Sequence, residues 1–327
     1  MENGKFVISL DFELLWGVFD KVHHEEKITY FKNTRQVIPR ILQLFSEFEI
    51  SCTWATVGML FNSNWNEWEC NRPQKLPAYI NSKLSAYNFG NSVKANGTED
   101  LCFAPDLVRQ IAETPGQELA THTYSHYYCS EKGQTVEAFQ ADLQKAITMA
   151  EAMGVELKSL VFPRNQLNPE YLKICKQLGI GTVRSNPENW YWKETEDSSF
   201  LKKVFRTGDA YFGKKDKSYP YSALKQEPGR PMEQKASRLL RPYSENSFLN
   251  RLKLNRVKAE MKTAAMKKEI YHLWWHPHNF GENPEKNLED LRQILTTYKQ
   301  LNREFGFESV SMKELYDLQR QKQPEIV

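Results

Sequence analysis

Short apolar runs alternate with amphipathic helical segments along most of this chain, and this alternation constrains the fold more than any other feature. The first run, KFVISLDFE at 5–13, is rich in β-forming residues, and a helical pattern follows at 37–48. Further strands are predicted at 50–57, 118–122, 159–162, 181–184 and 269–276, and further helices at 105–112, 136–153, 169–178 and 288–305. Such alternation predicts a parallel sheet with helices outside it, either open or closed into a barrel, and we favour the barrel.

Two stretches break the alternation and are interpreted as insertions. Residues 62–104 are rich in Asn, Trp, Pro and Gly without clear periodicity, which predicts a long ordered loop. A second insertion is predicted at about 186–268. The 327 residues fit one barrel domain covering 1–327 with both insertions. Pro39 is expected in the first turn of its helix.

Composition excludes several classes of protein. The net charge of +3 is too small to indicate a nucleic-acid partner, and we expect none. The five cysteines form no CxxC pair, which argues against a disulfide framework and a zinc knuckle. The N-terminal segment does not resemble a signal peptide, and no apolar run is long enough to span a bilayer. We therefore expect a cytoplasmic protein.

One local segment is strongly basic. Residues 248–268 contain apolar side chains at helical spacing among many Lys and Arg residues, which predicts a cationic amphipathic helix. Such a helix could contact anionic lipids at the inner face of the membrane, or the phosphates of a nucleotide- or lipid-linked sugar. The alternative is a solvated helix packed on the barrel.

Polar residues gather where the predicted strands end. Asp11 and Glu13 are two residues apart, so alternation places both carboxylates on one face at the end of the first strand. Two carboxylates in one pocket repel each other unless a cation neutralises them or they perform different tasks. A solvated strand end is the alternative interpretation for this pair alone.

The segment HTYSH contains two histidines, His122 and His126, spaced i, i+4. On a helical turn this spacing places both imidazoles within reach of one metal ion, and a carboxylate would complete a set of three ligands. The residues between them differ from the HExxH motif, so a catalytic base must come from elsewhere. A structural coincidence remains the alternative for an isolated pair.

Two further strand ends carry basic side chains. Arg164 in VFPRNQ follows a strand, where its guanidinium could hold a carboxylate through paired hydrogen bonds. In YHLWWHPHNF, alternation places His272, Trp274, His276 and His278 on one face. A histidine there is suited to donating a proton to a leaving group.

In this order, SLDFE, HTYSH, FPRNQ, RSNPENW and LWWHPHN resemble the motifs of the polysaccharide deacetylase family, which is carbohydrate esterase family 4 or the NodB-homology domain. The resemblance extends from Lys5 to about Asn279. It implies a distorted (β/α) barrel with its site at the carboxyl ends of the strands. It also implies roles for six residues: Asp11 as general base, Glu13, His122 and His126 as metal ligands, Arg164 as the residue orienting Asp11, and His276 as general acid.

The chain departs from the family pattern at several positions. Asp-Phe-Glu replaces the usual adjacent aspartates, and Asn165 stands where the arginine motif has proline. The aspartate that would orient the acid histidine has no clear counterpart, and Asn186 and Glu188 are the nearest candidates. Four residues are expected to contact substrate: Trp275, His278, Asn165 and Trp190.

The resemblance implies a metal-dependent N-deacetylase that acts on an amino sugar in surface polysaccharide biosynthesis. Zinc is the expected metal, although the ligand set also accepts Co, Ni, Mn or Fe. The substrate could be nucleotide- or lipid-linked, and the aromatic stretch NSNWNEWE could stack on sugar rings. Two alternatives stay open: a deformylase or other C–N hydrolase on a lipid-linked or small amide, and a catalytically silent carbohydrate-binding protein.

Overall fold

Within residues 3–187, 208, 211 and 216–322, which the computed structural model describes, nine strands form one sheet. Every ladder between these strands is parallel. The strand bounds are β1 Lys5–Phe12, β2 Cys52–Thr56, β3 Gln117–Thr121, β4 Ser159–Val161, β5 Thr182–Ser185, β6 Met232–Lys235, β7 Arg238–Leu239, β8 Ile270–Trp275 and β9 Glu308–Val310. The order is β6-β5-β4-β3-β2-β1-β8-β7, and β9 pairs with the beginning of β1.

Both faces of strand β1 are buried, and its side chains belong to two different apolar clusters. Ile8 and Leu10 belong to the large apolar core that the helices share with the sheet. Val7 belongs to a second apolar cluster, and Ser9 forms hydrogen bonds to side chains from β5 and β8 across the interior. Because strand side chains alternate, Asp11 continues the inward row of Val7 and Ser9.

The two edges of the sheet are joined by one short segment. Strand β6 pairs with β5, and β7, two residues further along, pairs with β8. Between them the N–H of Ala236 donates to Ser185 and the N–H of Ser237 donates to His272. The sheet therefore closes into a barrel through this segment. The prediction of an insertion over 186–268 is wrong for residues 232–239, which are part of the barrel wall.

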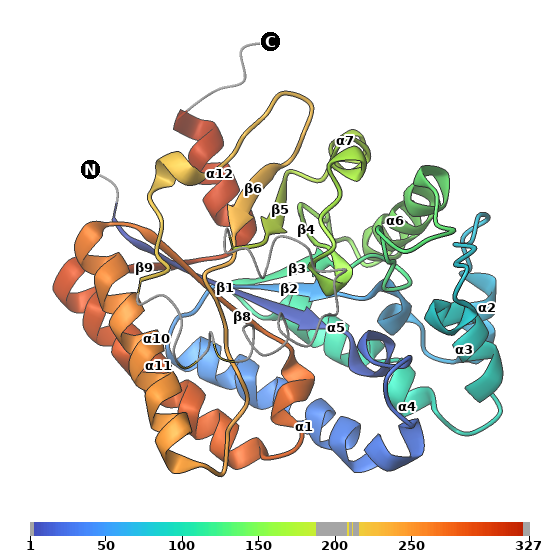
Figure 1. The fold of residues 1–327 in the computed structure, drawn as a ribbon, viewed down its shortest axis with the longest axis horizontal. Coiled ribbons are helices and arrows are strands. Elements are labelled where there is room, and N and C mark those ends of the chain that lie inside the picture. The colour runs from blue at the N-terminus through green and yellow to red at the C-terminus, as the bar shows by residue number, and fades with distance from the viewer. Residues whose placement is uncertain (1–2, 188–207, 209–210, 212–215, 323–327) are drawn as a thin grey trace.

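Helices surround the barrel (Figure 1). Their bounds are α1 Ile28–Glu47, α2 Trp65–Cys70, α3 Ala86–Val93, α4 Glu99–Cys102, α5 Pro105–Glu113, α6 Val136–Glu151, α7 Pro169–Gln177, α10 Ser247–Lys267, α11 Pro284–Phe305 and α12 Met312–Lys322. Helix α1 begins well before residue 37, so Pro39 lies inside the helix, and its expected place in the first turn is wrong. The C-terminal helix α12 contributes Met312 and Leu315 to the inner apolar cluster that contains Val7.

Helix α10 is the cationic helix predicted at 248–268, and it lies beside α11 (Figure 1). Its apolar residues Leu254, Val257 and Met261 are buried in the main core. A lipid surface would have to contact the apolar face of α10, but that face already packs against the protein core. The structure therefore favours the packed helix over the membrane contact. No helix among the described residues combines the length and apolarity that crossing a bilayer requires.

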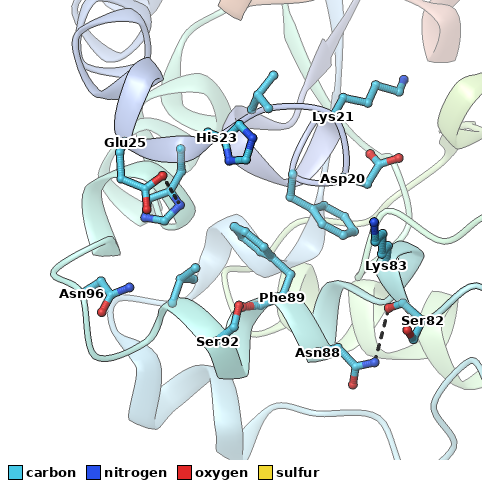
Figure 2. A pocket seen from close by; sticks show the side chains of 14 residues that line it. Asp20, Lys21, His23, Glu25, Ser82, Lys83, Asn88, Phe89, Ser92 and Asn96 are labelled. Atoms are coloured by element: carbon cyan, nitrogen blue, oxygen red, sulfur yellow. Dashed lines mark hydrogen bonds and ion pairs between the residues drawn. The ribbon is translucent and has the colours of Figure 1, made fainter.

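The stretch 62–104 is helical in part, with α2, α3 and α4, and the prediction of a loop without helices is wrong. Trp65 and Trp68 are buried against Trp16, with ring centroids 6.1 and 6.4 Å from it. These indoles belong to the core and are not available to stack on sugar rings, contrary to expectation. Residues between 82 and 96, which include α3, line one wall of a pocket, and residues 19–25 line its other wall (Figure 2).

Candidate active site

Parallel strands direct their carboxyl ends to one end of the barrel, and the predicted polar residues meet there. Asp11 lies at the end of β1, Glu13 directly follows that strand, and His122 directly follows β3. His276 directly follows β8, and its Nε2 lies 3.2 Å from Glu13 and 3.7 Å from Asp11. Residues far apart in the sequence thus form one cluster at the place where barrel enzymes carry their sites.

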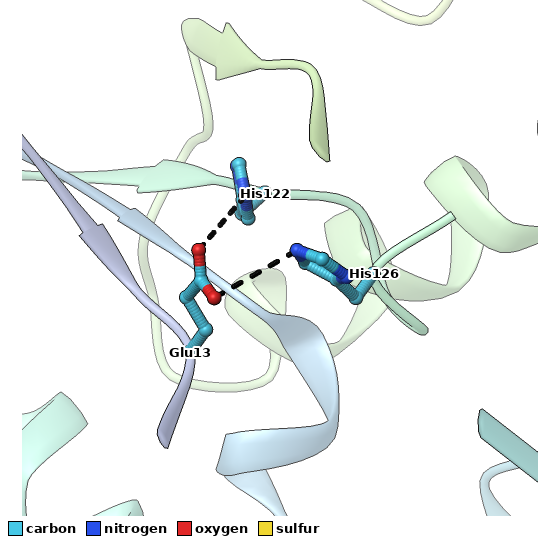
Figure 3. Close-up of side chains that lie close together, drawn as sticks. All are labelled: Glu13, His122 and His126. Carbon is cyan, nitrogen blue, oxygen red and sulfur yellow. Dashed lines mark ion pairs between the residues drawn. The ribbon is translucent and has the colours of Figure 1, made fainter. Parts of the chain in front are cut away.

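Glu13, His122 and His126 point toward one another (Figure 3). The Nε2 atoms of His122 and His126 lie 3.6 and 3.8 Å from the two carboxylate oxygens of Glu13, and all three residues are buried. Ligand atoms about 2.1 Å from a tetrahedral zinc ion stand roughly 3.4 Å apart. One ligand atom from each residue lies within 4.8 Å of the others, so the set can hold one divalent ion.

The second nitrogen of each imidazole is occupied. His122 Nδ1 lies 2.8 Å from the carbonyl oxygen of Val161, and His126 Nδ1 lies 3.1 Å from the hydroxyl of Tyr128. A carbonyl oxygen only accepts, so Nδ1 of His122 carries the proton and Nε2 presents a lone pair. That Nε2 is buried without a hydrogen-bond partner, as expected for an atom reserved for a metal.

The HTYSH segment reaches this geometry as a loop, and the expected helical turn is wrong. Thr123 and His126 have φ values of 64° and 55°, in the left-handed region that such residues rarely adopt. The buried carboxylate of Asp142 on α6 holds the loop, since it accepts hydrogen bonds from the backbone N–H groups of Tyr124 and Ser125. Sequence reasoning did not identify Asp142.

Asp11 is held by Arg184, which lies near the carboxyl end of β5. The guanidinium donates to both carboxylate oxygens at 2.7 and 2.8 Å, and both side chains are buried. Burial alone would raise the pKa of Asp11, but the charge of Arg184 is the largest opposing effect, and the pKa lies below its ordinary value. Arg184 also donates to Asn165 at 2.9 Å and lies 4.3 Å from the ring of Trp274.

Arg164 was predicted to orient Asp11, and the structure assigns that contact to Arg184. Arg164 instead forms an ion pair with Asp20, and its guanidinium lies 4.1 Å from the ring centroid of Tyr128. Arg164 has a positive φ of 54°, which turns the chain after β4. Arg164 follows β4 and Arg184 lies near the carboxyl end of β5, so the reasoning applied to Arg164 could also have identified Arg184.

His276 and His278 stack at the entrance of the cluster, with ring centroids 5.0 Å apart. Burial lowers the pKa of His276, but the carboxylates of Glu13 and Asp11 reverse this and raise it above its ordinary value. Burial and the charge of His276 lower the pKa of His278 to about 4. His276 is thus the histidine that holds a proton beside the carboxylates.

The expected substrate residues separate into three groups. Asn165 and His278 lie at the cluster. Trp275 faces the opposite way, buried between Phe45 and Phe280, so its assignment to substrate contact is wrong, and Trp274 is the indole on the site side. Trp190 lies outside the described residues.

Asn186 and Glu188 were the two residues predicted to orient His276. Asn186 donates its amide to the carbonyl oxygen of Asn165 at 2.8 Å, and Glu188 lies outside the described residues. Below the cluster, His272 Nε2 lies 2.8 Å from the hydroxyl of Ser9, and burial followed by the charge of Arg184 lowers its pKa to about 3. His272 is therefore a neutral residue of the barrel interior.

The barrel and this cluster define the class of protein, and comparison with known proteins identifies its family. Residues 19–183, just over half of the chain, match the family model "Polysaccharide deacetylase". The chain therefore belongs to the polysaccharide deacetylase family, a family of hydrolases that act on C–N bonds. The match begins after Asp11 and Glu13 and ends before Arg184 and His276, so these four are placed at the site by the structure and not by the family match.

Solved structures share the fold at low sequence identity. A Mycobacterium smegmatis protein described as a polysaccharide deacetylase superposes with a TM-score of 0.64 at 14% identity, covering 98% of this chain and 92% of its own. PuuE allantoinase gives 0.57 at 10%, covering 98% and 91%. A Pseudomonas aeruginosa PAO1 protein described as a polysaccharide deacetylase gives 0.56 at 10%, covering 98% and 92%. No curated protein sequence matches significantly. The fold is therefore the predicted distorted (β/α) barrel of the NodB-homology type.

Proposed function

We propose that this protein is a metal-dependent N-deacetylase that hydrolyses the N-acyl amide of an amino sugar, in the biosynthesis of a surface polysaccharide. The observation that supports it best is the buried set of Glu13, His122 and His126, with the unpartnered Nε2 of His122 directed at the carboxylate. Burial raises the pKa of Glu13, but the charge of His276 is the largest opposing effect, and the pKa lies well below its ordinary value, so the carboxylate is ionised. An ionised carboxylate and two neutral imidazoles suit a divalent cation such as zinc.

When bound there, the cation would polarise the acyl carbonyl and lower the pKa of water. Asp11 acts as general base: its carboxylate takes a proton from the attacking water while the water oxygen forms a bond to the acyl carbon. Its lowered pKa keeps it ionised, and the two hydrogen bonds from Arg184 fix its direction.

His276 supplies the second proton transfer. Its raised pKa keeps Nε2 protonated beside Glu13 and Asp11, and the proton passes from Nε2 to the amide nitrogen as the C–N bond breaks. Base and acid thus stand next to each other, with His276 the more exposed of the two toward solvent. Arg184 acts through Asp11 and is a positioning residue.

The test compares two variants in purified, zinc-loaded protein. Asp11→Asn should abolish turnover while one metal ion per chain is retained, whereas His122→Gln should lose both metal and turnover. Metal content is measured by elemental mass spectrometry, and released acid is measured with a panel of N-acetylated and N-formylated amino sugars. Full activity in Asp11→Asn, or a wild-type protein that binds no metal, would refute the proposal.

The panel also separates the alternatives. Release of formate without acetate would assign a deformylase, and hydrolysis of allantoin would assign a small cyclic amide as substrate. Metal-free protein that binds a sugar without hydrolysing it would assign a carbohydrate-binding protein. The cluster of base, acid and three ligands favours an enzyme over a carbohydrate-binding protein, and the family match favours a deacetylase over other C–N hydrolases.

A further inference from the structure

The two histidines of the metal-binding cluster are held in different ways. Nδ1 of His122 lies 2.8 Å from the carbonyl oxygen of Val161, a backbone atom of β4 that no side-chain substitution removes. Nδ1 of His126 lies 3.1 Å from the hydroxyl of Tyr128, a side-chain atom two residues further along the same loop. The direction of the second imidazole therefore depends on one side chain, which was not predicted from the sequence as part of the site.

The backbone around His126 gives its imidazole little support. The residue has a φ of 55° and belongs to neither a helix nor a strand. In a helix the i, i+4 spacing would by itself hold the two rings on one face, but the loop lacks that regular geometry. An imidazole ligand needs a fixed tautomer and a fixed ring direction, and a hydrogen bond at its second nitrogen supplies both.

The hydroxyl of Tyr128 could in principle donate to Nδ1 of His126 or accept from it. If it donated, the proton of the neutral imidazole would sit on Nε2, and that atom could not bind a cation. If it accepts, Nδ1 carries the proton, and Nε2, which lies 3.8 Å from Glu13, presents its lone pair. Only the second arrangement is compatible with a cation at the cluster, so the hydroxyl accepts.

Tyr128 is buried and is held from two other parts of the chain. Its backbone N–H donates to the hydroxyl of Tyr79 at 2.9 Å, and Tyr79 belongs to the stretch 62–104. The guanidinium of Arg164 lies 4.1 Å from the centroid of its ring. The ring meets the imidazole of His126 edge to face, with centroids 5.1 Å apart and an interplanar angle of 85°. Both the backbone and the ring of this tyrosine are thus fixed.

Arg164 is fixed in turn by two carboxylates. It forms an ion pair with Asp20, and its Nη1 lies 3.8 Å from Glu131. Direct contacts therefore run in series from Asp20 through Arg164 and Tyr128 to His126. This series ends at a metal ligand and does not include the proposed base, so the arginine predicted to orient the base has a different task in this chain.

We propose that Tyr128 is a positioning residue of the metal site, whose hydroxyl accepts a hydrogen bond from His126 and directs Nε2 of that imidazole at the cation. Arg164 acts through Tyr128 by holding the face of its ring. The inference rests on the proposed function, because it requires the cluster to hold a cation. It adds two residues that set the metal affinity without contacting the metal.

The first experiment measures zinc affinity by competition with a chelating dye. Tyr128→Phe keeps the ring but loses the acceptor, and the affinity should fall between about 10- and 100-fold, as for other partners of metal-binding histidines. Tyr127→Phe is the matched control, because its buried hydroxyl bonds to Gln134 and Thr135, away from the cluster. It should bind zinc as the wild type does, and circular dichroism verifies that both metal-free variants are folded.

Cobalt(II) in place of zinc gives a readout that a general loss of stability would not change. At saturating cobalt the visible absorption bands report the number and arrangement of the ligands. Tyr128→Phe should change the position or the intensity of these bands, because the ring of His126 is no longer fixed at Nδ1. Tyr127→Phe should keep the wild-type spectrum.

The role of Arg164 is tested by a double-mutant cycle on zinc affinity. Arg164→Lys keeps a charge beside Asp20 but loses the flat guanidinium, and the affinity should fall about two- to fivefold, as for one cation–π contact. In the Tyr128→Phe background the same replacement should cause no further loss, since no hydroxyl remains to be placed. Arg72→Lys, which removes a guanidinium 4.2 Å from the ring centroid of Trp68, is the matched control and should leave zinc affinity unchanged.

Equal zinc affinities and equal cobalt spectra in Tyr128→Phe and Tyr127→Phe would overturn the inference, while the proposed function would stand as long as both variants bind zinc. Losses that add up in Arg164→Lys/Tyr128→Phe would overturn the part assigned to Arg164, because that residue would then act on the metal by another route. A wild-type protein that binds no zinc would instead refute the proposed function, and with it the site on which Tyr128 acts.

Discussion

Arg184 and Asp11 form a buried, two-point ion pair, with Nη1 2.7 Å from Oδ1 and Nη2 2.8 Å from Oδ2. Only arginine offers two parallel donors with the spacing of a carboxylate. The same guanidinium donates to Ser9 at 3.1 Å and to Asn165 at 2.9 Å, so it joins β1, β5 and the loop after β4. The direction of the proposed base is thus set from across the barrel.

Replacement of Arg184 should impair catalysis more than replacement of Arg164. Arg184→Lys keeps a charge but loses the paired hydrogen bonds, and kcat should fall between about 10- and 100-fold, as for other residues that orient a catalytic group. Without the full pair the pKa of Asp11 rises, so the acidic limb of the kcat/KM profile should move to higher pH.

Steady-state kinetics over a pH range checks this, with Arg292→Lys as the control because its partner Glu47 lies on the surface. Circular dichroism verifies that each variant is folded. If Arg164→Lys shifted the acidic limb and Arg184→Lys did not, Arg164 and not Arg184 would be the residue that orients Asp11.

Gly17 should be essential for metal binding although it supplies no ligand. A Cβ atom at this position would stand 1.2 Å from Oε2 of Glu13. Gly17→Ala must therefore move the carboxylate away from His126, and metal affinity should fall about 10-fold or more. Competition with a chelating dye measures the affinity.

The clash involves the far end of a flexible side chain, so the melting temperature of the metal-free Gly17→Ala protein should stay close to that of the wild type. This separates a displaced ligand from a misfolded chain. Unchanged zinc affinity in Gly17→Ala would exclude Glu13 as a ligand in the conformation observed.

The two adjacent tryptophans of β8 should respond in opposite ways. Trp275→Ala removes a buried indole that packs on Phe280 and Phe45, and should lower the free energy of unfolding by about 3–5 kcal/mol. Trp274→Phe should change stability less and lower kcat/KM, because it alters the ring beside Arg184. Denaturant unfolding and kinetics on the same samples distinguish the two effects, and a larger kinetic loss in a folded Trp275 variant would contradict the assignment.

Several features of the fold follow from local patterns in the sequence. The strands that end at Asp11 and at His276 are apolar runs with polar ends, and their parallel pairing brings those ends together. Strands β6 and β7 have four and two residues, too few for a periodicity, so closure of the barrel at 232–239 was not predicted. In α1 the buried position before Val37 is the polar Thr34, so the apolar repeat is clear only from Val37 onward and conceals the beginning of the helix at Ile28.

The placement of side chains in the cluster agrees with the sequence where strand alternation decides their direction, and it differs where tertiary packing decides it. Alternation placed Trp274 and His276 on the inner face, and the choice of Trp275 for substrate contact went against that alternation. Arg164 and Arg184 both lie near the carboxyl ends of strands, and nothing local shows which of them reaches Asp11. Asp142 lies on α6, a helix, and its contact with the HTYSH loop depends on how α6 packs.

Asp142 should give the protein a stability that depends on pH. Burial raises the pKa of this carboxyl to about 6, although hydrogen bonds from Ser125 and Tyr124 oppose the shift. Between about pH 4 and pH 6 the folded protein keeps a proton that the unfolded chain has released. The folded state binds more protons there, so stability from this group falls as pH rises through that window, by on the order of 3 kcal/mol for a shift of this size.

Asp142→Asn removes the titration and keeps most of these contacts, because an amide oxygen in place of Oδ1 can accept from the backbone N–H groups of Tyr124 and Ser125, and an amide nitrogen in place of Oδ2 can donate to the Ser125 hydroxyl. In metal-free protein, the variant should therefore gain stability relative to the wild type as pH rises from 4 to 7. Denaturant unfolding at several pH values measures this difference. A difference that is constant over that range would show that the carboxyl titrates at its ordinary pKa, and one that favours the wild type increasingly at high pH would show that its charged form stabilises the loop.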